Sequence, residues 1–200
     1  FAATEHSCTP DLDMRLCEIR LTRMHRESGG KRDECPLNTT TMEKLISAYT
    51  PDDRETPVRL RKVADHFIFT ASNSCIERLY RLALEGHKRW FGPQHRETLA
   101  TALNLAGILN ELEEYEESIA LSRWIIDGYE RTLGPEHFWT LHQRANLACV
   151  LSLTGAKEEA LSLHRHVLTV FSRTRGREDY ETLQSANDLA VLLGATGRTT

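Results

Sequence analysis

Histidine and cysteine have the widest chemistry of the residue types in this sequence, and their spacing decides whether they could form a site. Thiolate and imidazole groups hold zinc when they recur in pairs at short, fixed intervals. Four such side chains fall near the N-terminus: His6, Cys8, Cys17 and His25. Their intervals match no recurrent zinc pattern, and His164 and His166 would diverge on a helix because they are two residues apart. We therefore expect no metal site and no cofactor.

Residues for catalysis are equally hard to place. A nucleophile or an acid-base pair needs a recognisable spacing on a rigid frame. The sequence contains no phosphate loop and none of the patterns G-x-G-x-x-G, H-E-x-x-H or G-x-S-x-G. We predict that the chain is not an enzyme and has no catalytic residues. One alternative stays open because the chain starts at Phe1 rather than at Met: it could be a regulatory part of a larger enzyme.

Composition limits the classes of partner. The net charge is −4 and the pI is near 6.2, whereas a nucleic-acid-binding domain carries a basic stripe. No apolar run approaches the roughly 18 residues that a membrane-spanning helix needs. The five cysteines are odd in number and include no C-x-x-C pair, which is typical of reduced thiols. We expect no nucleic acid, no membrane and a cytoplasmic location.

An internal repeat sets the positions of the other residues. Residues 92–133 and 134–175 align without a gap at an offset of 42, with 15 identities. The same offset relates Pro93 to Pro51 and Gly134 to Gly176. Agreement at one fixed offset indicates a repeat protein. We therefore divide the chain into an N-terminal helical region, 1–49, and a repeat array, 50–200, with repeats at 50–91, 92–133 and 134–175 and a half repeat at 176–198.

Each repeat has the apolar spacing of two helices. In the second repeat one helical face comprises Leu99, Leu103, Ala106 and Leu109, and another comprises Ile119, Ile125, Ile126 and Tyr129. Gly155 is placed to end a helix in the left-handed conformation. Ser74 with Glu77 predicts a capping box at the start of a second helix. Because proline in the G-P-x-H stretches stops a helix from continuing, each repeat is predicted to be a helical hairpin.

Small side chains recur where the hairpins would pack. One repeat position of the first helix holds Ala64, Ala106, Ala148 and Ala190, and one of the second holds Ser118 and Ala160. Small residues at fixed places let two helix backbones approach closely. We expect His95 and His137, in the linkers, to satisfy loop or cap hydrogen bonds. The half repeat would leave Leu189 and Leu193 exposed, which suits self-association or a following segment.

The pattern N-L-A-x-x-L, a short loop, Y-E-E-S or K-E-E-A, a second helix and G-P-x-H resembles tetratricopeptide repeats (TPR). The form it resembles is the 42-residue repeat of kinesin light chains and of the C-terminal arrays of fungal NOD-like receptor proteins. The resemblance spans residues 50–198 and is weaker in the first repeat, where Arg61 to Ala64 replace the Asn-Leu-Ala run. It implies an all-α fold, a right-handed α-α superhelix or solenoid of antiparallel helix hairpins. Residues 1–49 would then hold a degenerate capping repeat.

The resemblance also implies a binding site. In that family the first helices line a concave groove for an extended peptide or a partner helix, and recurring asparagines bond the ligand backbone. The residues at those places are Arg61, Lys62, Asp65, Asn104, His142, Asn146, Gln184, Asn187 and Asp188. Asn104 and Asn146 match the family pattern, whereas Asp188 departs from it. A second interpretation stays open, in which the two asparagines brace neighbouring helices.

The function that these observations favour is a non-enzymatic scaffold for protein-protein interaction, binding a peptide or partner helix in the groove. Arg61 and Lys62 would form a positive end suited to an acidic peptide or a C-terminal carboxylate. The alternative is that the array acts as a sensor or regulatory domain within a larger fungal NOD-like receptor or enzyme.

Overall fold

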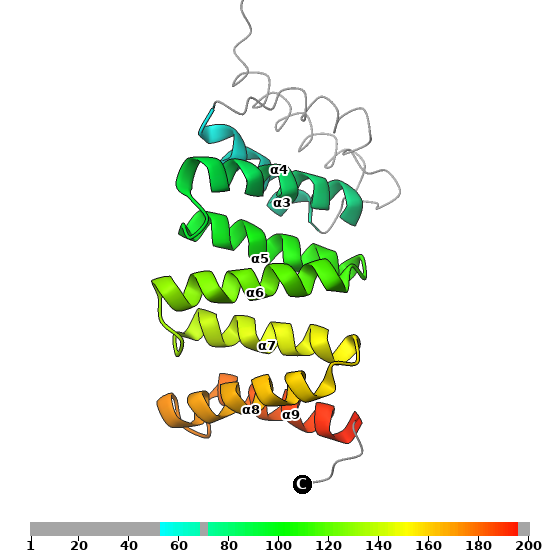
Figure 1. Ribbon diagram of the computed structural model, residues 1–200, viewed down its shortest axis with the longest axis vertical. Helices are drawn as coiled ribbons and strands as arrows, with labels where there is room; N and C mark the ends of the chain where they lie inside the picture. The colour runs from blue at the N-terminus through cyan, green and yellow to red at the C-terminus, as the bar shows by residue number, and fades with distance from the viewer. Residues whose placement is uncertain (1–52, 69–71, 196–200) are drawn as a thin grey trace, which may run out of the picture. The chain divides into compact units, whose positions relative to one another are not determined.

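The computed structural model describes residues 53–68 and 72–195 of the chain. The regular elements in these ranges are seven helices (Figure 1). In chain order they are α3 (Glu55–Phe67), α4 (Asn73–Phe91), α5 (Arg96–Glu111), α6 (Tyr115–Thr132), α7 (Phe138–Leu153), α8 (Lys157–Thr174) and α9 (Tyr180–Ala195). The predicted helical region 1–49 lies outside the described residues, and so do the outermost residues of the predicted array.

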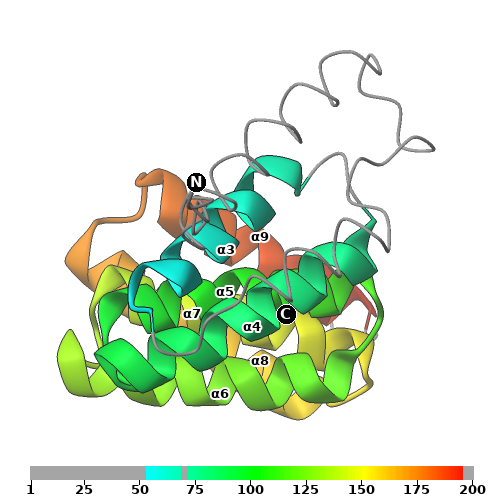
Figure 2. The ribbon, with the colours of Figure 1, turned by 90° about the horizontal axis from the view of Figure 1, so that it is seen from above.

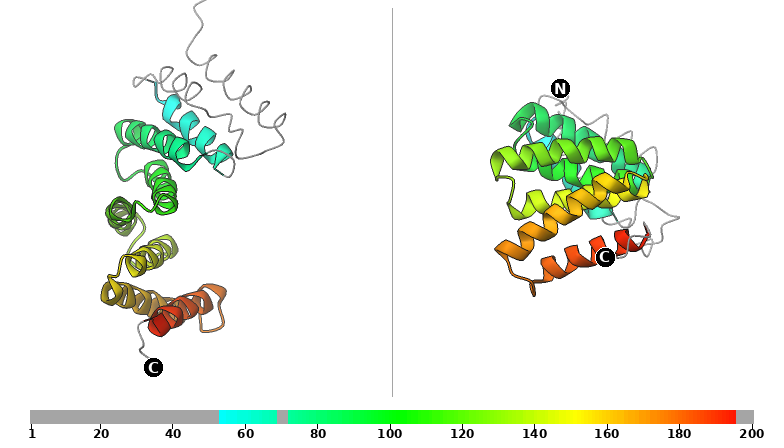
Figure 3. Two further views of the ribbon diagram at one scale, coloured as in Figure 1. Left: turned by 90° about the vertical axis from the view of Figure 1, so that its right-hand side faces the viewer. Right: turned by 60° about the horizontal axis from the view of Figure 1, so that its bottom comes forward.

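Two helices, α3 and α4, α5 and α6, and α7 and α8, fall within each of the predicted repeats, and α9 falls within the predicted half repeat. They form two compact units, one ending at Thr101 and one beginning at Ala102, so the boundary falls within α5. In the first unit α3 packs on α4. In the second, α7 packs on α6 and α8, and α8 packs on α9. Successive helices of the second unit run in opposite directions (Figures 1 and 2), with α6 and α8 in one layer and α7 and α9 in the other (Figure 3).

A glycine in a left-handed conformation ends the second helix of each repeat. Gly92, Gly134 and Gly176 have φ angles of 90°, 100° and 94°, a region that a β-carbon disfavours. The backbone N–H of Gly134 bonds to the carbonyls of Tyr129 and Glu130 at 3.2 and 3.1 Å. These bonds satisfy carbonyls that the helix end would otherwise leave unpaired. The prediction that this linker stops the helix is confirmed.

The residue three positions after each linker glycine caps the next helix. The side chains of His95, His137 and Asp179 accept the backbone N–H two residues further on, at 3.2, 3.3 and 3.1 Å. Asp53 does the same for Glu55 at 3.0 Å. The first N–H groups of a helix have no acceptor within it, so each bond satisfies one of them. The expectation that the two histidines satisfy cap hydrogen bonds is confirmed.

The turns inside the second and third hairpins also use a left-handed residue. Gly155 has a φ of 86°, as predicted, and Glu113, at the same position of the second repeat, has a φ of 61°. The turn after α5 closes with a bond from the Glu114 N–H to the Leu109 carbonyl at 2.8 Å. Glu113 therefore holds a conformation that costs a residue with a β-carbon roughly 1 kcal/mol relative to glycine.

The predicted capping box of α4 is wrong. The N-cap is Ser72, whose hydroxyl accepts the N–H of Cys75 at 3.4 Å. Glu77, which was predicted to bond back to Ser74, forms an ion pair with Arg81 one turn further on. An i, i+4 ion pair on a helix competes for the glutamate, and Ser72 is available to start the helix two residues earlier.

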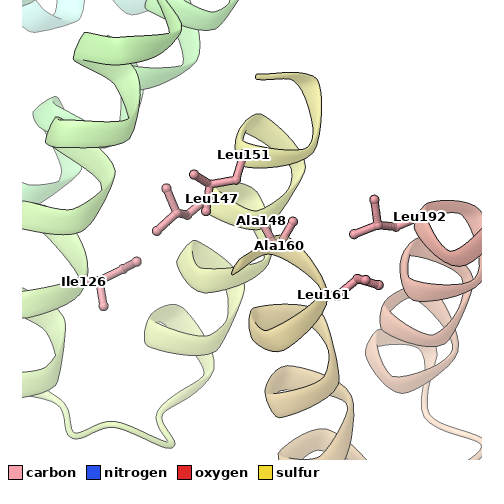
Figure 4. Packing of buried hydrophobic residues seen from close by; sticks show 7 residues of the cluster. All are labelled: Ile126, Leu147, Ala148, Leu151, Ala160, Leu161 and Leu192. Carbon is pink, nitrogen blue, oxygen red and sulfur yellow. The ribbon is translucent and has the colours of Figure 1, made fainter. Parts of the chain in front are cut away.

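Apolar side chains of the second unit form its core. One cluster consists of Ile126, Leu147, Ala148, Leu151, Ala160, Leu161 and Leu192. Figure 4 shows Leu192 reaching from α9 toward α8. The small residues Ala106 and Ser118 are buried, and the Ser118 hydroxyl donates to the Ala106 carbonyl at 3.1 Å. This bond requires the two helix backbones to lie close together, which confirms the packing role predicted for the small side chains at these positions.

Helix α9 differs from the prediction in two ways. Ala190, expected to be a packing contact, is exposed, because within the described residues no helix covers that face of α9. Leu189 and Leu193, expected to be exposed, are partly buried against the core cluster, since they share the face of Leu192 that meets α8. The exposed apolar side chains of α9 are instead Tyr180, Leu183 and Val191.

Candidate binding groove

A hollow of about 490 Å³ lies in the second unit, between α7 and the C-terminal part of α5. We call it the α5–α7 groove. Its lining comprises Leu103, Ala106, Gly107, Asn110, Glu111, Glu113, Tyr115, Ser122, Gln143, Asn146, Cys149, Val150 and Leu153. Its two walls are the first helices of consecutive repeats, and α6, the helix between them in the chain, contributes Tyr115 and Ser122. Ligand sites are typically concave surfaces of this kind, with apolar walls and a few polar groups.

The groove opens where the second repeat has small side chains. Gly107 and Ser122 occupy the repeat positions that Asp65 and Tyr80 hold in the first repeat. In the first repeat the Tyr80 hydroxyl donates to Asp65 Oδ1 at 2.7 Å, so the two side chains meet between α3 and α4. A β-carbon on Gly107 would have no heavy atom within 4 Å. The width of the groove is therefore set by two residues whose counterparts are much larger.

A chain of polar side chains crosses the floor of the groove. The Gln143 side chain is buried, and its Nε2 donates to Ser122 Oγ at 3.1 Å. Nδ2 of Asn146 lies 3.5 Å from Gln143 Oε1 and 3.4 Å from His142 Nδ1. These contacts turn the amide nitrogen of Asn146 toward the protein. Asn146 Oδ1 has no hydrogen-bond partner among the described residues, and Asn110 Oδ1 is buried without one.

One end of the groove is acidic. Glu111 and Glu113 line it, both are exposed, and neither forms an ion pair with any residue that the structure describes. The lining contains no lysine or arginine. The last turns of α5 and α7, which border the same region, also contain no basic residue. The two carboxylates, with no cation beside them in the lining, therefore make the electrostatic potential at this end negative.

The sequence-predicted residues of the second and third repeats lie at or near the groove. Asn146 lines it, whereas Asn104 lies on the same helix as several lining residues but is not one of them. His142 contacts Asn146 and the rings of Phe138 and Trp139, with centroid distances of 5.8 and 6.1 Å. Only Asn146 of the three therefore borders the hollow directly.

The residues predicted in the first repeat belong to the other unit. Arg61 lies 3.4 Å from a carboxylate oxygen of Glu97 and 3.8 Å from one of Asp65. Asp65 also accepts the Tyr80 hydroxyl. Lys62 is exposed. Of the two cations that were expected to form a positive end, Arg61 already has two carboxylate partners.

The residues predicted in the half repeat lie on α9. Gln184 Nε2 donates to Asp188 Oδ1 at 3.1 Å, one helical turn away. Gln184 and Asn187 are exposed, and Asp188 is half-buried. None of the three borders the α5–α7 groove.

Asp188 lies near two other groups with chemistry, Cys149 and His164. Burial and the negative charge of Asp188 raise the pKa of the Cys149 thiol, and burial lowers the pKa of His164 although Asp188 opposes this. A raised thiol pKa is the opposite of what an activated nucleophile needs. The described residues contain no hydrogen bond joining the three, and no group of side chains suited to a metal ion.

None of the described helices is long and apolar enough to cross a membrane.

A second hollow, of about 440 Å³, lies over α6, α7 and α8. Two ion pairs border it, Arg123 with Glu159 at 2.9 Å and Arg144 with Glu130 at 2.7 Å. Arg144 also lies 2.7 Å from Nε2 of His166. Because these charged groups already have partners, this hollow has fewer free polar groups for a ligand than the α5–α7 groove has.

Of the residues that line the groove, the sequence analysis named Asn146 as a binding residue, but it missed the rest of the polar lining. Ser122 comes from a second helix, and Glu113 from a turn, whereas the family pattern predicts ligand contacts from first helices. A signal for Ser122 and Gly107 was present in the repeat alignment. They are small residues where the first repeat has Tyr80 and Asp65.

Comparison with known proteins supports the fold. Residues 97–171 match the family model of the tetratricopeptide repeat. A Podosopora anserina protein with nearly identical TPR-like repeats of the kinesin light chain type aligns with a TM-score of 0.72 and 18% identity, covering 96% of this chain and 90% of that one. A single-residue variant of that protein gives 0.73, also with 18% identity and coverage of 96% and 90%. BtubC (BKLC) from P. vanneervenii gives 0.63 with 15% identity, covering 95% and 75%. A search of curated proteins finds no match.

These likenesses confirm the predicted fold class: all-α, built from TPR-type helix hairpins like those of kinesin light chain-like repeats. At such low identity, similarity to the solved structures is evidence for the fold alone. The predicted fungal NOD-like receptor context stays a prediction.

Proposed function

We propose, on the premise that residues 97–171 are tetratricopeptide repeats, that this chain is a scaffold for protein-protein interaction whose α5–α7 groove binds a peptide or a partner helix. The observation that carries the proposal is the pairing of apolar walls with carboxamide oxygens that have no partner among the described residues. A buried acceptor without a hydrogen bond costs about 1–3 kcal/mol. A ligand that supplies the missing donor recovers this free energy.

An extended peptide segment suits the groove chemically. Its backbone N–H groups are donors for Asn146 Oδ1, and for Asn110 Oδ1 when the half-buried Asn110 side chain rotates its buried oxygen toward the groove. Its apolar side chains would contact Leu103, Val150 and Leu153, which line the walls. The contact between Gln143 and Asn146 orients the second amide in advance, which reduces the entropy lost on binding.

The double variant Asn110→Ala/Asn146→Ala tests this proposal. We expect it to weaken binding of a fluorescent pool of randomised, end-blocked peptides about tenfold, because two hydrogen bonds are lost. Fluorescence anisotropy measures the affinity, and circular dichroism checks that helix content is unchanged. Gln94→Ala removes an exposed carboxamide outside the groove and serves as the control. Wild-type affinity in a folded double variant would contradict the proposed site.

The remaining residues implied by the family resemblance are proposed as extensions of the binding surface in their own repeats: Arg61, Lys62, Asp65, Asn104, His142, Gln184, Asn187 and Asp188. An acidic ligand at the first repeat is the less favoured form of the proposal, because Arg61 has two carboxylate partners. If charge reversal at Lys62 leaves the binding of acidic peptides intact, the acidic-ligand form of the proposal is wrong.

The biological role of the scaffold has three candidate forms: motor or cargo adaptor, sensor array of a fungal NOD-like receptor, and regulatory domain of an enzyme. The genomic sequence on either side separates them. Coiled-coil heptads, a nucleotide-binding domain and a catalytic domain are the respective expectations. A cytoplasmic location, and self-association through the exposed apolar residues of α9, belong to the same set of predictions.

A further inference from the structure

The lining of the α5–α7 groove includes four side chains with oxygen acceptors, and three of them, Asn110, Glu111 and Glu113, lie at its acidic end. Asn110 Oδ1 is buried without a partner, Asn146 Oδ1 has none among the described residues, and the carboxylates of Glu111 and Glu113 are unpaired there. No cationic side chain lines the groove to balance them. Acceptors of this kind bind charged donors more strongly than neutral ones.

Three helix ends meet at the acidic end of the groove. α5 ends at Glu111 and α7 ends at Leu153, and both residues line the groove. Both helices therefore bring their C-terminal carbonyl groups to the same end of the groove. Cations are stabilised at helix C-termini, and neither last turn supplies a basic side chain of its own. The N-terminus of α6 offsets part of this helix charge, because α6 begins at Tyr115, which lines the same end. The carboxylates and the carboxamide oxygens are thus the features that favour a cation.

We propose that the segment bound in the α5–α7 groove is basic, with a lysine or arginine side chain placed between Glu111, Glu113 and the carboxamide of Asn110. The proposal rests on the proposed function of the groove and names the chemistry of its ligand. It differs from the acidic ligand expected at Arg61 and Lys62. The apolar walls contact the neighbouring side chains of the same segment, and the small residues Gly107 and Ser122 make room for its backbone.

Charge-sorted peptide pools test the proposal. Three fluorescent pools of end-blocked peptides of about ten residues, basic, neutral and acidic, are long enough to cross the groove because an extended chain advances about 3.3 Å per residue. We expect the basic pool to bind wild-type protein at least about tenfold more tightly than the acidic pool, and salt to reduce the difference.

The double variant Glu111→Gln/Glu113→Gln should reduce binding of the basic pool about three- to tenfold and leave binding of the neutral pool unchanged. The matched control is Glu116→Gln/Glu178→Gln, which removes the same net charge from two exposed residues outside the groove lining. If the control variant loses as much binding as the groove variant, the effect is one of net charge and the proposal is wrong.

A third variant separates this proposal from the proposed function. Gly107→Leu places a side chain in the groove, and the added β-carbon meets no heavy atom within 4 Å, so the helix is retained. We expect it to abolish binding of every pool. Gly194→Leu, a helical glycine on α9 with the same free space, is its control. If Gly107→Leu blocks binding but the pools show no preference for basic peptides, the ligand chemistry is wrong and the groove is right. If Gly107→Leu binds like wild type, or no pool binds wild type, both are wrong.

Discussion

At the scale of single residues, the repeat places equivalent positions in equivalent backbone conformations even where the side chain differs. Gly155 and Glu113 both end the first helix of a hairpin with a positive φ, 86° and 61°. Glycine adopts this region without a steric cost, whereas a glutamate does not. Glu113 also lines the acidic end of the groove, so the residue that strains the turn is one that the proposed ligand would contact.

The first prediction concerns this turn. Glu113→Gly should raise the free energy of unfolding by about 1 kcal/mol, because the left-handed strain is relieved. Urea titration followed by circular dichroism measures the change. Gly155→Ala is the converse variant and should lower the free energy of unfolding by a similar amount. A Glu113→Gly protein that is less stable than wild type would contradict the account of the turn.

His87 is a buried titratable residue, and its environment fixes one protonation state. The Thr101 hydroxyl donates to the Glu97 carbonyl at 2.9 Å, so its oxygen accepts from His87 Nδ1 at 2.8 Å. The proton of the neutral ring is therefore on Nδ1, and Nε2 is buried without a partner. Burial, reinforced by the positive charge of Arg61, lowers the pKa of His87 from 6.5 to about 4.

The second prediction follows from that pKa. The unfolded chain binds a proton at His87 near pH 6.5, whereas the folded chain does so only near pH 4. Stability from the neutral ring is thus fully present above pH 6.5 and is lost as the pH falls toward 4, by about 1–3 kcal/mol. Denaturation at a series of pH values measures the slope. His87→Leu should flatten it, and an unchanged slope in a folded variant would show that His87 is not its source.

At the scale of elements, helix boundaries depend on capping residues, and not every capping residue recurs from repeat to repeat. Linker glycines and the following cap residues recur at a fixed offset, so the sequence predicted where those helices stop and start. The start of α4 has no such copy, and two serines were available. Ser72 is the cap because Glu77 pairs with Arg81 rather than with the backbone near Ser74.

The third prediction compares those serines. Ser72→Ala should lower the free energy of unfolding by about 0.5–1 kcal/mol, because one first-turn N–H loses its acceptor. Ser74→Ala lies inside the first turn of α4 and should change it by less than about 0.3 kcal/mol. Thermal denaturation of the two variants beside wild type measures the difference. The reverse order would restore the capping box predicted from the sequence.

At the scale of the molecule, the helical hairpins could be predicted from the sequence because helical spacing, linkers and small packing residues repeat, and the family resemblance supplied the fold class. The groove could be predicted only in part. Asn146 follows the family pattern, whereas the opening depends on where the repeat departs from itself, at Gly107 and Ser122. The ion pair of Arg61 with Glu97 could not be predicted, because Glu97 lies in the next repeat and the sequence was interpreted one helix at a time. The exposure of Ala190 likewise depends on what packs over the last described helix.

The central claim is that a ligand occupies the α5–α7 groove. The reactivity of the Cys149 thiol tests this claim directly, because Cys149 lines the groove. Its thiol lines the groove and the residue is exposed, so alkylation is possible in the free protein. Although the residue is exposed in part, partial burial of its thiol and the negative charge of Asp188 raise the pKa of that thiol, so the reaction needs mildly alkaline pH. The decisive measurement is the alkylation rate of Cys149, followed by mass spectrometry, with and without the basic peptide pool. We predict that saturating peptide slows the reaction at Cys149 at least about tenfold and leaves Cys75, outside the groove, unchanged. Equal rates at Cys149 while anisotropy shows the peptide bound would contradict the account.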